Sequence, residues 1–246
     1  MKQLLTLFAL TICTLAIAQQ GTIIYEEALK LEIDLPEGIE LPEGFPDAQV
    51  SKNVLYFNGQ ESTYKAYDDQ SAIELGESNG DTNFNIKIKR PEYFLYKNLA
   101  KNKKHELREF FGKRFIIEDD IDKSAWKIGT DTKEILGYQC TSALLQDTSG
   151  TTIAWFTTEI PITNGPGKYS QLPGLILEVN INDGKRTLSV TSIDLKRTKT
   201  EEIQKPSKGK VVTQAQFDEI IVKKMKEMGA VRGEGGTIKM IVTEDF

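Results

Sequence analysis

The side chains that most often carry out chemistry are scarce in this chain. It has 246 residues but only one histidine, His105, and two cysteines, Cys13 and Cys140. A zinc site usually needs several His or Cys ligands, and a Ser-His-Asp triad would need His105 as its base. Because His105 lies in the charged run KNKKHELREF, we expect it at a solvated surface. The sequence therefore predicts no metal site and no catalytic histidine.

Cys140 is the one remaining nucleophile of note. It lies in GYQCT, residues 137–141, which we expect to form a strand. A buried cysteine behaves as a small apolar side chain, and this is the favoured interpretation. The alternative is a reactive thiol, or a disulfide to another chain.

Cofactor motifs are missing from the sequence. Residues 120–131 begin like a calcium loop, but Ala125 stands where a glycine is needed. No phosphate loop, dinucleotide fingerprint or nucleophile elbow occurs. Carboxylates are so numerous that a glycosidase pair could be neither excluded nor located. We therefore expect no cofactor, and we favour a protein that is not an enzyme.

The N-terminus and the net charge indicate an exported protein. Residues 1–18 carry Lys2, then an apolar run that ends in Ala16-Ile17-Ala18, which is typical of a cleaved signal peptide. A retained anchor is the alternative. No other segment is long enough to cross a membrane, and Cys13 is misplaced for lipidation. The net charge of −5 disfavours nucleic acid. We expect an unlipidated protein in the periplasm or on the periplasmic face of the outer membrane.

Hydrophobic periodicity in the mature chain is mostly two. Residues 30–35 and 83–89 alternate apolar and polar side chains, as strands with one buried face do. Turn signals such as Asn58-Gly59 and Asp183-Gly184 separate such runs. The pattern predicts a mainly β fold, a curved antiparallel sheet or incomplete barrel built from hairpins, with a C-terminal amphipathic helix.

The hairpin at Asp183-Gly184 can be given a register. A two-residue turn there places Val179 opposite Leu188 and Leu177 opposite Val190, all on one face. Beyond Val190 the apolar phase slips, so we expect a bulge near Thr191-Ser192. Continuing the same pairing would set Gly174 opposite Ile193.

The remaining segments complete a single β-rich domain over residues 19–246. Two copies of Leu-Pro-Glu-Gly within residues 35–45 predict an acidic surface loop. A capping box at Thr213 and an apolar stripe from Phe217 to Met228 predict a helix over about 213–228, with the stripe packed on the core. Residues 237–242 alternate again and are a candidate last strand.

One block of motifs suggests a family. ILGYQC (135–140), AWFTTEIP (154–161), GP (165–166) and LPGLILE (172–178) follow in order. The chain resembles the GLPGLI family of exported proteins from Bacteroidota, although Gln171 replaces the motif's first glycine. If that glycine has a left-handed backbone, this chain must do without it. The motif residues, which we expect to be structural first, are Trp155, Pro161, Gly165, Pro166, Leu172, Pro173, Gly174, Leu175 and Ile176.

The resemblance implies a setting and no chemistry. Members of that family have no agreed activity and are associated with TonB-dependent outer-membrane receptors. We therefore expect a non-enzymatic binding or accessory protein of the periplasm or cell envelope, serving an outer-membrane transport complex, with an envelope protein as partner. One alternative is a carrier of an apolar ligand with lipocalin-like or lipoprotein-carrier-like architecture. A hydrolase is the least favoured.

Overall fold

A computed structural model of the chain describes most of the residues between 20 and 230. The expected signal peptide (1–18), the repeat loop (35–45) and the candidate last strand (237–242) lie outside the described residues. The described ranges are 20–31, 46–67, 72–79, 82–89, 92–148, 150–196 and 198–230.

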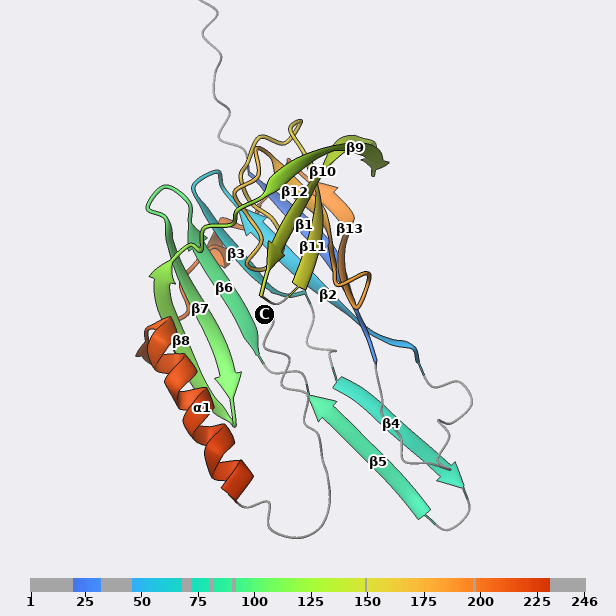
Figure 1. Cartoon of the computed structure of the whole chain (residues 1–246), viewed down its shortest axis with the longest axis vertical. Helices are drawn as coiled ribbons and strands as arrows, with labels where there is room; N and C mark the ends of the chain where they lie inside the picture. Colours follow the sequence, from blue (N-terminus) through green and yellow to red (C-terminus); the bar gives the residue numbers. More distant parts are fainter. Residues whose placement is uncertain are drawn as a thin grey trace, which may run out of the picture.

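Fourteen strands and one long helix make up this part of the chain. Twelve of the strands form one open sheet in the order β14-β8-β7-β6-β3-β2-β1-β13-β12-β11-β10-β9, and β4 and β5 form a separate pair (Figure 1). Only β14 runs parallel to its neighbour, β8. The strands are β1 (Gly21–Lys30), β2 (Ala48–Phe57), β3 (Glu61–Ala66), β4 (Ala72–Asn79), β5 (Thr82–Lys89), β6 (Tyr93–Asn98), β7 (Lys103–Phe110), β8 (Lys113–Asp120), β9 (Lys127–Ile135), β10 (Tyr138–Asp147), β11 (Gly150–Thr157), β12 (Leu175–Ile181), β13 (Arg186–Asp194) and β14 (Lys210–Val212).

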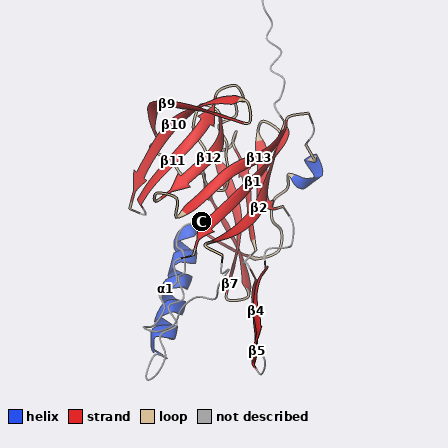
Figure 2. Cartoon of the chain, turned by 90° about the vertical axis from the view of Figure 1, so that its right-hand side faces the viewer, coloured by secondary structure: helices blue, strands red, loops and turns tan. Residues whose placement is uncertain are grey.

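The expected fold class is confirmed. The structure is mainly β, its large sheet is almost wholly antiparallel, and its helix follows the last strand (Figure 2). Strands β2, β3, β6, β7 and β8 are neighbours in the order of the chain, and so are β9 to β13. The first strand, β1, joins them by pairing with β2 on one side and β13 on the other. The sheet is therefore continuous only because β1, from the start of the described chain, pairs with β13, which is far along the sequence.

The register of the β12–β13 hairpin was predicted correctly near its turn. Val179 faces Leu188, as expected. The bulge is also confirmed, because Ile24 pairs with Ser192 while Tyr25 pairs with Val190, which leaves Thr191 unmatched. The bulge bends the strand at the point where the apolar phase slips.

The prediction that Gly174 faces Ile193 is wrong. The β12–β13 ladder ends at Glu178 and Ser189, and beyond it Ile193 pairs with Ile23 on β1. Gly174 instead lies against β11. A Cβ atom at Gly174 would fall 2.0 Å from the carbonyl oxygen of Thr157. Glycine is required there because the two backbones touch.

The core consists of two large clusters within the sheet and a smaller one under the helix. Tyr25, Phe57 and Leu177 are among the fully buried side chains of the first. Phe156 and Ile176 belong to the second. The connection from β11 to β12, residues 158–174, supplies buried side chains to both clusters, so it contributes to the core.

Helix α1 (Gln214–Ala230) begins with the expected capping box. The Gln216 amide donates to Thr213 Oγ1 at 3.3 Å, and the Thr213 amide donates to Gln216 Oε1 at 3.0 Å. Phe217 is 2% exposed and packs on the third cluster. Met225 is 41% exposed, so the expected core stripe is buried only at its start. No helix in the described ranges has the length and apolarity needed to cross a bilayer.

Replacing Gly174 with alanine tests the contact between the two backbones. The added methyl group must push β12 away from β11, so we expect Gly174→Ala to lower the free energy of unfolding by about 3 kcal/mol. Gly184→Ala is the matched control, because Gly184 has a positive φ of 85° but nothing within 4 Å of its Cβ position. It should cost about 1 kcal/mol from backbone strain alone. Equal losses in chemical denaturation would contradict the contact.

Cys140 provides a second test of packing. It is 1% exposed, and burial raises the pKa of its thiol to about 11. Since the thiolate is the reactive form, a disulfide reagent at about pH 8 should modify the folded chain at least about a hundredfold more slowly than the chain in denaturant. Equal rates in the two states would show that the strand does not protect Cys140.

Candidate functional site

A row of polar side chains crosses the face of the sheet that carries the first core cluster. Strand pairing puts these side chains on one face, among apolar neighbours such as Tyr25 and Leu95. We call this set the polar belt. Its members are Glu27, Asn53, Tyr64, Tyr93, Glu106, Arg108 and Arg186.

The centre of the polar belt is a buried ion pair. Arg186 Nε lies 2.9 Å from Glu27 Oε1, and Asn53 Nδ2 donates to Glu27 Oε2 at the same distance. Glu27 is only 5% exposed. A carboxylate buried to this degree is tolerated only when it is paired and hydrogen-bonded. The pair therefore fixes the relative positions of β1, β2 and β13.

A second ion pair lies toward the helix. Arg108 Nε is 2.5 Å from Glu106 Oε1, and Glu106 is 3% exposed. The Arg108 guanidinium also lies 5.7 Å from the ring centre of Phe217, within the range of a cation–π contact. Helix α1 thus covers this end of the polar belt.

Tyr93 is influenced by both ion pairs. Burial raises the pKa of its phenol well above the ordinary value, and the Glu106 carboxylate raises that pKa further, while Arg108 and Arg186 lower it. The hydroxyl is consequently protonated at neutral pH, so the phenol carries an O–H donor.

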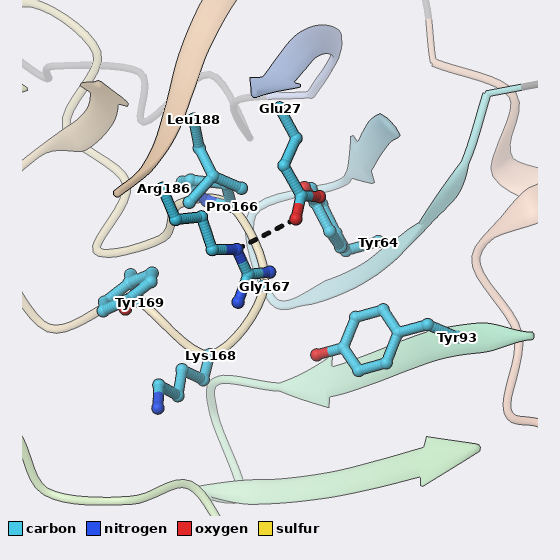
Figure 3. A pocket seen from close by; sticks show the side chains of 9 residues that line it. All are labelled: Glu27, Tyr64, Tyr93, Pro166, Gly167, Lys168, Tyr169, Arg186 and Leu188. Atoms are coloured by element: carbon cyan, nitrogen blue, oxygen red, sulfur yellow. Dashed lines mark hydrogen bonds and ion pairs between the residues drawn. The ribbon is translucent and has the colours of Figure 1, made fainter. Parts of the chain in front are cut away.

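A small recess opens beside the Glu27–Arg186 pair (Figure 3). One side is formed by Tyr64, Tyr93 and the ion pair, and the other by Pro166 to Tyr169 of the β11–β12 connection. We call residues 165–169 the recess wall. The cavity volume is about 10 Å³, which is room for one water molecule. The recess combines a carboxylate, a guanidinium and aromatic hydroxyls at one point.

The structure brings few of the motif residues to this recess. Pro166 lines it, and Gly165 precedes it in the recess wall. Trp155 lies elsewhere, with Lys133 Nζ at 4.5 Å from its ring centre. Six motif residues are buried: Gly165, Pro166, Leu172, Gly174, Leu175 and Ile176. Pro161 and Pro173 are exposed.

Gln171, which replaces the first glycine of the motif, has a left-handed backbone conformation. Gln171 has a positive φ of 72°. Its side-chain oxygen accepts a hydrogen bond from the Ser124 amide at 3.0 Å, a contact that a glycine could not make.

His105 and Cys140 take no part in the recess. His105 Nδ1 lies 3.1 Å from Glu118 Oε1, and both residues occupy positions that alternate to the opposite face from Glu106. Cys140 belongs to the first core cluster. Within the described ranges, no three His, Cys, Asp or Glu side chains gather in a way that could hold a metal ion.

Sequence reasoning missed the polar belt. One signal was present in TIIYEEALK, where Glu27 occupies the same alternate face as Ile23 and Tyr25. A carboxylate at such a position must have a partner. The partner, Arg186, is 159 residues away along the chain, and no local pattern reveals it.

Solved structures of similar fold support the architecture. Two structures of PNGF-II, in the P21 and C2 space groups, match with TM-scores of 0.54 and 0.53 and sequence identities of 18% and 17%. Each match covers 84% of this chain, and 34% and 33% of the PNGF-II chains. This chain therefore spans about a third of their length, and at such identities the likeness shows the fold alone. No curated protein matches the chain.

A family model settles the family. The model described as "N-glycanase peptide, N-terminal domain" matches residues 78–223, more than half of the chain. The suggested membership of the GLPGLI family is therefore wrong. The expectations of a non-enzymatic accessory of TonB-dependent outer-membrane transport and of an apolar carrier are wrong as well, because the matched family is described as an N-glycanase. The motif block that suggested the GLPGLI family spans the β9–β10 turn, β11, the β11–β12 connection and the start of β12, and it does not by itself identify a family. The chain belongs to the family of N-glycanase N-terminal domains.

Proposed function

We propose that this chain acts in the removal of N-linked glycans, and that the polar belt is where it engages the glycan-bearing peptide. The support from sequence is the family match, since the family is described by an N-glycan-cleaving enzyme. The support from geometry is the recess, where a buried ion pair and Tyr93 face the half-buried residues Gly167 and Lys168 of the recess wall.

The chemistry of the recess suits a polyhydroxylated ligand. Carboxylate, guanidinium and phenol groups can bond to neighbouring sugar hydroxyls, and aromatic rings can contact the apolar faces of sugar rings. Glu27 and Arg186 are already held by each other and by Asn53. A ligand would therefore meet groups whose positions are set before it binds, which lowers the cost of ordering them.

Hydrolysis by this chain itself is a second candidate, favoured by one observation. The recess has room for one water molecule beside the Glu27 carboxylate. A carboxylate next to a confined water can act as a general base.

The proposed setting is outside the cytoplasm. This rests on the signal-peptide pattern of residues 1–18. It places the chain where glycoproteins from other cells or from the medium would be met.

Calorimetric titration with an N-glycopeptide tests the main proposal. We expect saturable binding of the glycopeptide and none of the same peptide without its glycan. Tyr93→Phe removes one donor from the recess and should weaken binding about tenfold. Tyr67→Phe is the matched control, because Tyr67 is 49% exposed and lies outside the polar belt; it should bind like the wild type. Equal affinity for the two peptides would refute the proposal.

Mass spectrometry of the same mixtures tests the second candidate. If Glu27 activates water, the wild type should release glycan from the peptide and Glu27→Gln should release at least about a hundredfold less. The peptide product also identifies the bond: asparagine remains after cleavage between sugar residues, and aspartate appears after hydrolysis of the side-chain amide. Binding without any release would reject hydrolysis by this chain and leave the binding proposal intact.

A further inference from the structure

Lys97 ties the recess wall to the sheet. It is on β6, two residues from Leu95 and four from Tyr93, so all three side chains share the face of the polar belt. Lys97 is 1% exposed. Its Nζ donates to the carbonyl oxygens of Gly167 at 2.9 Å and Gly165 at 3.4 Å. These carbonyls flank Pro166, which lines the recess.

The surroundings of Lys97 do not favour a positive charge. Directly across on β7 is another lysine, Lys104, whose own partner is Asp122 at 2.5 Å. Across on β3 is Ser62, a buried hydroxyl that lacks a hydrogen-bond partner within the described residues. Within those residues, no carboxylate pairs with Lys97.

Other charged groups lie near, but each is farther along the strands or on the recess wall. Glu106 is held by Arg108. The titratable and charged groups on this face of β7, β8, the loop that follows β8, and the recess wall are Lys104, Glu106, Arg108, Lys113, Asp119, Asp122, Lys168 and Tyr169.

Burial, and then the Lys104 charge, lower the pKa of Lys97 to about 7. A solvated lysine has a pKa of about 10.4. If the wall opens and exposes Lys97 to solvent, the Lys97 amine therefore binds a proton more tightly than it does when the wall is closed. By linkage, falling pH favours the open form from about pH 10 down to about pH 7, and has no further effect below that. The neutral amine can still donate to both carbonyls, so the closed form is stable in alkali.

We propose that Lys97 is an acid-sensitive anchor of the recess wall, which releases residues 165–169 when its amine is protonated and so admits a ligand to Glu27 and Arg186. The proposal rests on the proposed function only for the identity of that ligand. Some such opening is needed, because a cavity of about 10 Å³ cannot hold a sugar ring.

Trp126 provides a readout of the wall. Its indole Nε1–H donates to the Ser170 carbonyl at 2.9 Å, and its ring lies 6.3 Å from the ring of Tyr169. Release of the wall must break or loosen this hydrogen bond. Hydrogen exchange of the Trp126 indole proton, followed by NMR, therefore reports the opening.

The experiment compares wild type with Lys97→Met at each pH, so that the intrinsic pH dependence of exchange cancels. The ratio of wild-type to variant exchange rates should rise about tenfold for each unit of pH decrease from about pH 9 to about pH 7.5, the signature of one proton. It should level off below about pH 7. A ratio that does not change with pH would overturn the proposal.

Two further variants separate Lys97 from its neighbours. Lys104→Met removes the like charge, so the levelling point should move to higher pH. This variant also decides the matter if Lys97→Met fails to fold, because an unmoved profile would contradict the role of Lys97. His105→Gln removes the chain's one histidine, a side chain that ordinarily titrates near neutrality. Its profile should match the wild type, and loss of the profile would assign the effect to His105.

The anchor and the proposed function can fail separately. An exchange profile as described, with no glycopeptide binding at any pH, would sustain the anchor and reject the glycan as ligand. Glycopeptide binding with an exchange ratio that does not change with pH would support the glycan as ligand and reject the anchor. If both hold, the association rate of the glycopeptide should rise as pH falls toward about 7 and become independent of pH in Lys97→Met.

Discussion

The ion pair between Glu27 and Arg186 is the contact on which the central sheet depends. It joins β1 to β13, and Asn53 extends it to β2. Removing one partner alone would leave a charge buried without compensation, which is far more costly than exchanging both. Because the apolar clusters surround both charged groups, folding of the native chain must pair the two charges as it buries the clusters. The same two charged side chains line the recess, so one ion pair both joins the central strands and supplies the charged groups of the candidate site.

The family match and the geometry bear on different questions. The match assigns the chain to a family, while the solved structures show that the fold recurs within longer proteins, of which the match covers about a third. The geometry brings one carboxylate, one guanidinium and three tyrosine side chains together in the recess. The recess is too narrow for a sugar ring, and Lys97 donates two hydrogen bonds to the wall that bounds it.

Much of the fold could be predicted from sequence because its rules are local. The alternation of apolar and polar residues predicted the strands, and Asp183-Gly184 predicted a turn. The change in the phase of this alternation after Val190 predicted the bulge at Thr191. The capping box at Thr213 gave the start of the helix. The candidate site could not be predicted in this way. Glu27 and Arg186 meet only because strands from opposite ends of the sequence pair, and Lys97 looks like any surface lysine until Gly165 and Gly167 are placed over it.

The position of β1 in the sheet also determines the order in which the strands can pair during synthesis. The neighbours β2, β3, β6, β7 and β8 pair within one stretch of chain, and β9 to β13 pair within another. Each stretch can pair as soon as it has emerged from the ribosome, because its contacts are short in sequence. β1 emerges before either, yet its second partner, β13, is made last among the strands it touches. One edge of β1 must therefore wait unpaired through most of synthesis, and an unpaired edge is where strands from other chains add. The strand that completes the sheet is thus the one most exposed to misassembly while the chain is being made.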